Sequence, residues 1–282
     1  MTKINRVLIY GCGLVGGSLA LTLKKHHPDL YIEGVSRSQA SIDFAVKNGI
    51  IAHGAADLSG CSTQVDLAII ATPIDQTPSD IAKVSAHINT PCILTDVASV
   101  KSYIEEQAPP LKQTHTLILG HPMAGSDKTG VQNASDSIMA GAKYILIPQE
   151  NESYNLLKDF LASAQFRLLE MNAKDHDLYA AYASHLPYIM ASLTTHALAT
   201  LSDAEQAKIQ PILAKGFADT TRVAGSDPNW GVDICKHNKE SLLTTLNHVE
   251  TKLKTLKKQI ELGDLNAVRE VLETSAQFKR KG

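Results

Sequence analysis

Two side chains suited to proton transfer follow segments that we expect to be strands. His121 comes two residues after the apolar segment 116–119 ends, and Ser99 comes shortly after the apolar segment 92–95. In a parallel sheet the carboxyl ends of the strands meet at one edge, where ligands bind. An imidazole exchanges its proton near neutral pH, so His121 is a candidate catalytic base and Ser99 a candidate partner for a substrate hydroxyl. The plainer alternatives are a surface histidine and a serine that caps a helix.

Two further candidates lie in the second half of the chain. His185 stands two residues before Pro187, inside a segment, 173–201, that we expect to be one long helix. Proline removes a backbone N–H and is expected to kink this helix near His185, which then either lines a site or is a satisfied core residue. Arg222 lies beside a turn-rich segment, where its guanidinium could bind a carboxylate through two hydrogen bonds or cap the end of a helix.

A glycine-rich segment near the start of the chain has the spacing of a nucleotide-binding turn. It follows the apolar segment 6–10 and precedes residues 19–25, which we expect to be helical. Gly11 permits the tight turn, Gly13 lets the backbone approach a pyrophosphate, and Gly16 lets the helix pack close to the strand. The free N–H groups at the start of the helix then face the phosphates. We therefore predict dinucleotide contacts at Gly11, Gly13, Leu14, Val15 and Gly16.

The end of the second expected strand, residues 30–35, indicates which dinucleotide binds. An acidic residue at this point holds the ribose 2′-hydroxyl of NAD, whereas an arginine accommodates the 2′-phosphate of NADP. The chain has Ser36 and Arg37 here, and Glu33 lies too early, inside the strand. A hydroxyl and a guanidinium suit a phosphate, although a helix-capping serine beside a solvated arginine is the alternative. We predict NADP as the preferred cofactor and NAD as the second choice.

The first half of the chain alternates expected strands with expected helices, which indicates a parallel sheet with right-handed crossovers. The continuous apolar segment 66–71 is typical of a central strand. It ends at Thr72 and Pro73, which we expect to contact the cofactor. The other expected strands are residues 6–10, 30–35, 92–95, 116–119, 142–148 and 166–170, and the expected helices are residues 38–48, 76–87 and 152–164.

From about residue 172 onward the chain has no convincing strand pattern. We expect helices over residues 173–201, 209–217, 239–262 and 264–278, with residues 219–228 outside the helical pattern. The third of these carries apolar residues at alternating steps of four and three, a heptad pattern that suits a core helix, a dimer seam or both. These residues are Leu242, Leu246, Val249, Leu253, Leu256 and Ile260. The sequence predicts an α/β fold, with a Rossmann-type doubly wound sheet in residues 1–171 and an all-helical domain in residues 172–282.

The composition narrows the class of protein further. The 282 residues include 27 basic and 29 acidic side chains, so nothing favours a nucleic-acid partner. There is no run of apolar residues long enough for a membrane span, and the start of the chain leads directly into a strand without a signal peptide. The four cysteines are widely spaced and form no C-x-x-C pair, so we expect reduced, mostly buried thiols, no metal site and a cytoplasmic protein.

Taken together, the motifs resemble those of the prephenate/arogenate dehydrogenase family of tyrosine biosynthesis. Beyond the glycine motif, the chain carries in order Thr-Pro-Ile at 72–74, Asp-Val-Ala-Ser-Val-Lys at 96–101, Gly-His-Pro-Met-Ala-Gly-Ser at 120–126, His-Asp at 176–177, Ser-His-Leu-Pro at 184–187 and Thr-Arg-Val-Ala-Gly at 221–225. The resemblance covers about residues 6–262. It implies a Rossmann domain, a helical domain that forms a homodimer, and an active site in the cleft between them.

The resemblance also implies a reaction and a role for each candidate residue. The enzyme would remove a hydride from C4 of a cyclohexadienol, pass it to the nicotinamide, and release CO₂ as the ring becomes aromatic. His121 would accept the hydroxyl proton, and Ser99 would bind the same hydroxyl or orient His121. Arg222 would hold a substrate carboxylate, with His185 and Ser126 as further substrate contacts.

Two departures from the family pattern bear on the substrate. Tyr188 stands where prephenate-using members often have histidine, and Ala218 stands where they often have arginine. With Ser36 and Arg37, these changes favour an NADP-dependent arogenate dehydrogenase, or an enzyme that accepts both substrates. The alternatives are another two-domain reductase, of the β-hydroxyacid dehydrogenase or imine reductase type, and a non-catalytic NADP-binding sensor. The reductases would be expected to use a lysine, serine or threonine on a helix of the second domain.

Overall fold

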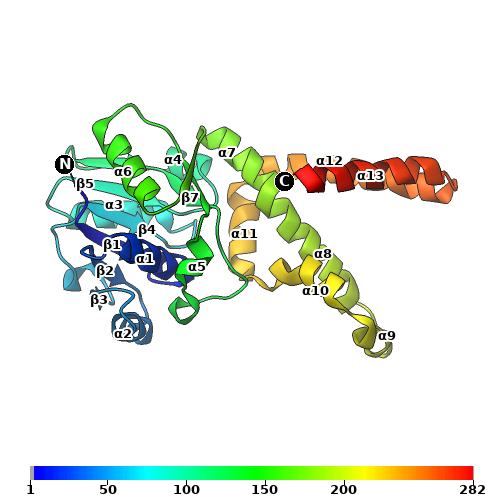
Figure 1. Ribbon diagram of the computed structural model, residues 1–282, viewed down its shortest axis with the longest axis horizontal. Helices are drawn as coiled ribbons and strands as arrows, with labels where there is room; N and C mark the ends of the chain where they lie inside the picture. The colour runs from blue at the N-terminus through cyan, green and yellow to red at the C-terminus, as the bar shows by residue number, and fades with distance from the viewer. Residues whose placement is uncertain (1–2, 282) are drawn as a thin grey trace.

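A six-stranded parallel sheet forms the centre of the N-terminal half of the protein (Figure 1). The computed structural model describes residues 3–281. The strand order is β3-β2-β1-β4-β5-β6, so the order reverses between β1 and β4 and opens a crevice at their carboxyl ends. The strands are β1 (Arg6–Tyr10), β2 (Tyr31–Val35), β3 (His53–Ala55), β4 (Leu67–Ile70), β5 (Cys92–Asp96) and β6 (His115–Ile118). The short β3 is absent from the sequence prediction, because three residues carry too little pattern.

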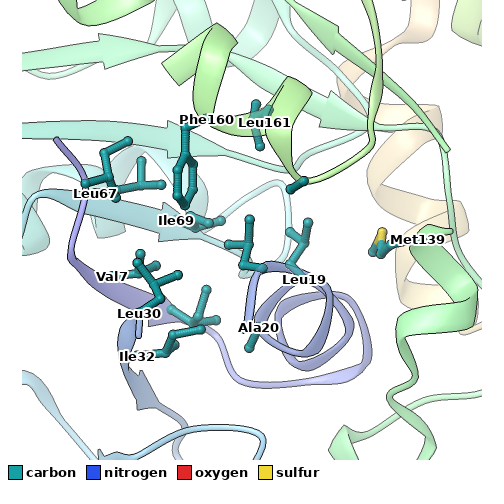
Figure 2. Close-up of a cluster of buried hydrophobic side chains, with 14 of the residues drawn as sticks. Val7, Leu19, Ala20, Leu30, Ile32, Leu67, Ile69, Met139, Phe160 and Leu161 are labelled. Atoms are coloured by element: carbon teal, nitrogen blue, oxygen red, sulfur yellow. The ribbon is translucent and has the colours of Figure 1, made fainter. Parts of the chain in front are cut away.

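Both faces of this sheet are covered, which explains why its central strands are continuously apolar. Val7 and Ile9 of β1 pack with α1 (Leu14–His26) and α6 (Glu152–Ser163) on one face, as Figure 2 shows for Val7. Leu8, which points to the other face, packs with α3 (Thr77–His87). The remaining helices of this half are α2 (Gln39–Lys47), α4 (Ser102–Glu106) and α5 (Asp136–Met139).

A second, three-stranded sheet follows the first. It has the order β7-β8-β9, with β7 antiparallel to β8 and β8 parallel to β9. Its strands are β7 (Gly120–Pro122), β8 (Lys143–Leu146) and β9 (Arg167–Glu170). The expectation of one parallel sheet throughout the first half is therefore correct for six strands. It is wrong for the predicted strands at residues 142–148 and 166–170, because β8 and β9 pair with each other and with β7 in a separate sheet.

The helical half begins with one long, interrupted helix. It consists of α7 (Ala173–Ala180), a π-helical turn (Ala181–His185) and α8 (Leu186–Ala199). The predicted long helix is confirmed, and its irregular turn lies just before Pro187. Proline cannot donate the N–H that a regular helix needs four residues after Ala183, so the turn widens there.

The rest of the helical half differs in part from the prediction. The predicted helix over residues 209–217 is wrong as one continuous helix: α9 (Asp203–Ile209) ends where it should begin, Pro211 lies in a 3-10 turn, and only residues 215–217 are α-helical, in α10 (Lys215–Thr221). The expectation that residues 219–228 leave the helical pattern is also wrong for most of this segment, since α10 continues to Thr221, a 3-10 helix spans Arg222–Gly225, and the next α-helix begins at Pro228. The helices are α9 (Asp203–Ile209), α10 (Lys215–Thr221), α11 (Pro228–His237), α12 (Lys239–Glu261) and α13 (Leu265–Lys281).

The heptad helix α12 pairs with α13 to form an arm that extends away from the sheet (Figure 1). Leu242 at its base is buried, whereas Leu253 and Ile260 further along are exposed. The prediction that the heptad residues pack in a core is thus confirmed only at the start of α12, near Leu242. Among residues 3–281, no helix combines the length and apolar character needed to cross a membrane. All four cysteines are free thiols; three are buried and Cys235 is exposed.

Candidate active site

A cavity of about 650 Å³ opens at the crevice between β1 and β4 and is closed on its far side by the helical half. Its walls come from the glycine turn, from the ends of β4 and β5, from β7 and the loop after it, and from α8 and α11. Most of the predicted site residues lie here. Those that line the cavity are Gly13, Leu14, Val15, Thr72, Pro73, Ser99, His121, Ser126 and Arg222.

The glycine turn has the shape that a dinucleotide requires. Gly11 has a φ of +104°, and a Cβ there would lie 2.5 Å from the carbonyl oxygen of Ala71. A Cβ on Gly16 would lie 2.4 Å from the carbonyl oxygen of Gly11, which confirms the close approach of helix and strand. Gly13 has open space around it and begins α1 without a side-chain cap, so the helix N–H groups face the cavity. These features fit a pyrophosphate bound at the helix start.

Other parts of the expected cofactor site lie around this turn. Thr72 lines the cavity, and its buried Oγ1 has no hydrogen-bond partner among the described residues. Ser36 and Arg37 lie outside the cavity, directly after β2, with Ser36 half-buried and Arg37 exposed. The carbonyl of Val35 accepts the N–H groups of Gly11 and Cys12, at 3.0 and 2.9 Å, and so holds the end of β2 beside the glycine turn.

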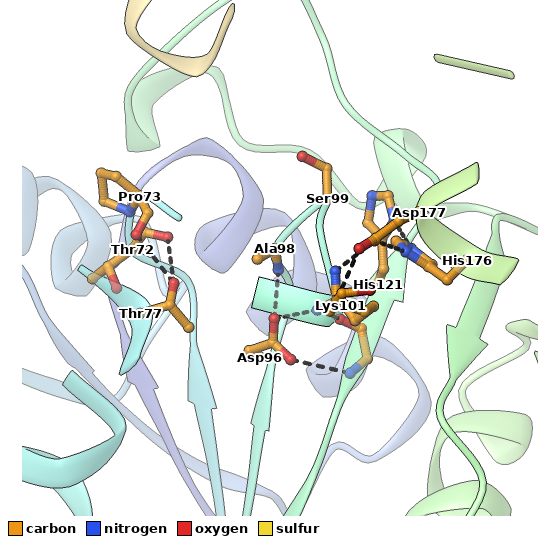
Figure 3. A network of polar contacts seen from close by, with 12 residues as sticks. Thr72, Pro73, Thr77, Asp96, Ala98, Ser99, Lys101, His121, His176 and Asp177 are labelled. Atoms are coloured by element: carbon orange, nitrogen blue, oxygen red, sulfur yellow. Dashed lines mark hydrogen bonds and ion pairs between the residues drawn. The ribbon is translucent and has the colours of Figure 1, made fainter. Parts of the chain in front are cut away.

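A chain of hydrogen bonds orients His121 (Figure 3). Its Nδ1 lies 2.8 Å from Nε2 of His176, and Nδ1 of His176 lies 2.8 Å from a carboxylate oxygen of Asp177. A carboxylate only accepts, so His176 donates its Nδ1 proton to Asp177 and its Nε2 accepts. His121 must then donate from Nδ1 to His176. This leaves Nε2 of His121 as the atom that can take a proton.

Asp177 is ionised in this arrangement. Burial opposes its ionisation, but hydrogen bonds from His176, Lys101 and Ser102 outweigh burial and lower the pKa of the carboxyl group. The backbone N–H groups of Lys101 and Ser102 lie 2.7 and 2.9 Å from its two oxygens. A negative charge is therefore held two hydrogen bonds from His121.

His121 is neutral near pH 7 and ready to act as a base. The residue is 8% exposed and lines the cavity wall. Burial holds the pKa of His121 well below the usual histidine value, and the neighbouring His176, Lys101 and His185 lower it further. Since His176 is fully buried, the imidazole chain is shielded from water.

A buried ion pair holds the backbone that carries His121. Asp96 and Lys101 are both fully buried and bonded to each other. Asp96 accepts the N–H of Gly120 at 3.2 Å, and Lys101 donates to the carbonyl of Gly120 at 2.7 Å. The backbone N–H and carbonyl of Gly120, the residue before His121, are thus both held by hydrogen bonds. Sequence reasoning assigned no role to this pair, since only the fold shows that the lysine is buried.

Ser99 lies at the cavity and is held from the helical half. The indole N–H of Trp230 donates to its Oγ at 3.0 Å. His185 lies behind this wall, fully buried and outside the cavity lining, with a pKa lowered by burial to about 4. Asn238 donates to its Nδ1 at 3.1 Å, so Nε2 of His185 carries the proton and has no partner among the described residues. Trp230 was not singled out from the sequence, although it is the single tryptophan of the chain.

Arg222 and Ser126 lie at the rim of the cavity. The guanidinium of Arg222 is 3.6 Å from the carboxylate of Asp127, and both side chains are partly exposed. Ser126 donates to the same carboxylate at 3.2 Å. A cation that faces the cavity and remains accessible to solvent is suited to an incoming carboxylate.

The fold and the site together define a nucleotide-dependent dehydrogenase. The family model "Prephenate dehydrogenase, nucleotide-binding domain" matches residues 19–170, and the model "Prephenate dehydrogenase, dimerization domain" matches residues 172–274. The chain belongs to the prephenate/arogenate dehydrogenase family, as its motifs predicted, and is an enzyme of that family.

Relatives of known sequence and structure agree with this assignment. The prephenate dehydrogenase of Bacillus subtilis is 30% identical over 98% of this chain and 75% of its own length. The crystal structure of Synechocystis arogenate dehydrogenase is 29% identical, covers 98% of this chain and 99% of its own, and superposes with a TM-score of 0.78. That of prephenate dehydrogenase from Aquifex aeolicus, in complex with hydroxyphenyl propionate and NAD⁺, is 28% identical, covers 99% and 98%, and has a TM-score of 0.85.

Proposed function

We propose that the protein converts arogenate to tyrosine, prephenate to 4-hydroxyphenylpyruvate, or both, with NADP as the preferred hydride acceptor. The observation that carries this proposal is the neutral His121 at the nucleotide crevice, with its Nδ1 proton committed to His176 and its Nε2 free to accept. A base in this state suits the removal of a hydroxyl proton from a cyclohexadienol.

The chain's own groups account for the proton steps. A nicotinamide held at the glycine turn would supply the acceptor for the hydride that leaves C4 of the substrate. Nε2 of His121 accepts the C4 hydroxyl proton, while Asp177 stabilises the positive charge that develops on the imidazole chain. Ser99 binds the same oxygen. The C1–carboxylate bond then breaks and CO₂ leaves, and the electrons of that bond enter the ring. The ring becomes aromatic, the negative charge develops on the C4 oxygen, and His121 returns the proton to this oxygen.

The substrate preference rests on the cavity wall. Arg222 would bind a substrate carboxylate, with Ser126 beside it. Tyr188 places a phenol where many prephenate-using relatives have a histidine, and Gly231 leaves room for it, since a Cβ on Gly231 would lie 2.5 Å from the Tyr188 hydroxyl. Ala218, in α10 and outside the cavity lining, supplies no charge where such relatives often have an arginine. Fewer cationic groups favour the amino acid side chain of arogenate over the pyruvyl group of prephenate.

The cofactor preference rests on the residues after β2. Arg37 is exposed there, and no acidic residue stands at 36–38 to bind a ribose 2′-hydroxyl. This supports NADP, whereas the Aquifex aeolicus relative was crystallised with NAD⁺. NAD is therefore the alternative that the assay must include.

We also propose that the protein is a homodimer joined through residues 172–282, with residues 1–171 as the nucleotide-binding domain. The match to a dimerization domain supports this, as does the apolar surface of the α12–α13 arm. Its exposed side chains include Leu253, Ile260, Leu272 and Phe278.

One assay tests the reaction. Purified protein is mixed with arogenate or prephenate and with NADP or NAD, and reduced nicotinamide is followed by absorbance. We expect turnover of a cyclohexadienol, fastest with arogenate and NADP. Binding of NADP without turnover of either substrate would instead identify a sensor, and reduction of a β-hydroxyacid or an imine would identify another reductase.

A further inference from the structure

Helix α11 lies with one face along the nucleotide-binding domain. Trp230, Ile234 and His237 are spaced at i, i+4 and i+7, so they share this face. Ile234 in the middle is fully buried and packs in the cluster that contains Ile74. At the first end Trp230 donates to Ser99 of the active site. The alignment of the whole helix therefore decides where the indole meets Ser99.

The second end of α11 is anchored by a carboxylate from the other domain. Asp75, in the loop between β4 and α3, accepts Lys236 Nζ on its two oxygens at 2.6 and 2.8 Å. It also bonds Nε2 of His237 at 2.5 Å. The ring of Tyr103 packs against His237 with the ring centres 3.7 Å apart and the ring planes tilted by 34°. The His237 side chain is only 5% exposed, so this anchor is well packed on one side.

The anchor is connected to the cavity at both ends. Thr72, Pro73 and Ile74, which directly precede Asp75, line the cavity beside the glycine turn. Seven helical steps of 1.5 Å, about 10 Å along α11, separate Trp230 from His237. A shift at Asp75 is thus carried along α11 to Ser99.

The indole bond determines what Ser99 can do. Because the Trp230 N–H occupies an acceptor site on Oγ, the hydroxyl proton of Ser99 remains free to point into the cavity. In that state Ser99 donates to the substrate oxygen from which His121 removes a proton. Without the indole, the hydroxyl rotates freely and this direction is lost.

We propose that Asp75 is a positioning residue for the reaction: by anchoring Lys236 and His237 it sets the alignment of α11, so that Trp230 directs the Ser99 hydroxyl toward the substrate. This inference rests on the proposed function of Ser99. Asp75 itself does not line the cavity and acts only through α11.

The experiment uses Asp75→Asn, which keeps the size of the side chain and removes its charge. Trp230 is the single tryptophan, so intrinsic fluorescence reports its surroundings directly. We expect emission at longer wavelength, stronger quenching by acrylamide, and a kcat lowered about three- to tenfold, as the loss of a partly exposed ion pair and its hydrogen bonds allows. The Kd for NADP, measured by calorimetry, should change by less than about twofold. Asp75→Glu should restore both the emission and kcat in part.

Asp136→Asn is the matched control. It breaks the Lys25–Asp136 ion pair, which is also 2.6 Å long with a carboxylate of similar exposure, 39% against 43%, but which lies within the nucleotide-binding domain. This variant should keep the wild-type emission and kcat. Should Asp75→Asn fail to fold, Lys236→Met carries the same test, since it removes the main donor from an exposed position.

Unchanged Trp230 emission in a folded Asp75→Asn protein overturns the proposal, and so does a shifted emission with unchanged kcat. A wild-type protein that turns over neither cyclohexadienol contradicts the proposed function instead. In that case the emission of the two variants still decides whether Asp75 aligns α11.

Discussion

The substitution Asp177→Asn tests the state of the catalytic histidine most directly. The two carboxylate oxygens accept three N–H donors, from His176, Lys101 and Ser102. An amide offers one acceptor and one donor, so at least one of the three N–H groups must face its NH₂ group. If the NH₂ faces His176, the proton of His176 moves to Nε2, and that of His121 must move to Nε2, the atom that should accept.

The size of the effect follows from the charge that is lost. Two hydrogen bonds of 2.8 Å and one imidazole ring separate Asp177 from His121, or about 8 Å between charge centres. At an effective dielectric constant of about 20, a unit charge at that distance stabilises a protonated His121 by about 2 kcal/mol. This corresponds to a kcat lowered by about thirtyfold, and by more where the tautomer is reversed. The buried donor left unpaired should lower the free energy of unfolding by about 1–3 kcal/mol.

The assay is steady-state reduction of the nicotinamide by wild-type protein and variant, together with calorimetric titration of the dinucleotide. We expect kcat to fall while the Kd for the dinucleotide stays the same, because Asp177 lies away from the glycine turn. Asp175→Asn, two residues earlier in α7 and half-buried, is the matched control and should retain wild-type kcat. A folded Asp177→Asn protein with a kcat within about twofold of wild type would refute the reasoning.

Three further predictions concern the base and the cofactor. His121→Asn should lower kcat by about 10²–10⁴ with dinucleotide binding intact, and full turnover would remove His121 from its role. Because burial and then His176 and Lys101 hold the pKa of His121 well below the histidine value, the neutral base persists as the pH falls. The kcat/KM profile should therefore stay level through about pH 6.5 and decline only in more acid solution; a decline centred at or above that pH contradicts this. Arg37→Ala should raise the KM for NADP much more than the KM for NAD, and an equal rise would count against binding of the 2′-phosphate.

The sequence predicted the elements whose signals are local. The glycine turn follows β1 and opens α1 as expected, because its spacing is set by neighbouring residues. The apolar segments of the parallel sheet were also readable, since both faces of those strands are covered. Local signals failed where few residues carry them, as in the three-residue β3. They also failed at Pro211, because a proline can either begin a helix or interrupt one.

The sequence predicted which residues belong to the candidate site better than it predicted how they are arranged. His121 and Ser99 do line the cavity, and Arg222 and Ser126 reach its rim. Ser36 and Arg37 lie outside it, so their role in binding NADP stays a prediction. His185, for which a core role was left open, is buried behind the wall.

What the sequence determined by itself was the strand, turn and helix around each motif, together with the chemical type of each side chain. Only the tertiary structure decided which of these side chains meet. His121 and His176 are 55 residues apart, Lys101 and Asp177 are 76 apart, and Ser99 and Trp230 are 131 apart. Such pairs form because the sheet and the helical half pack against each other, and their burial, which sets the protonation state of His121, exists only once the chain has folded.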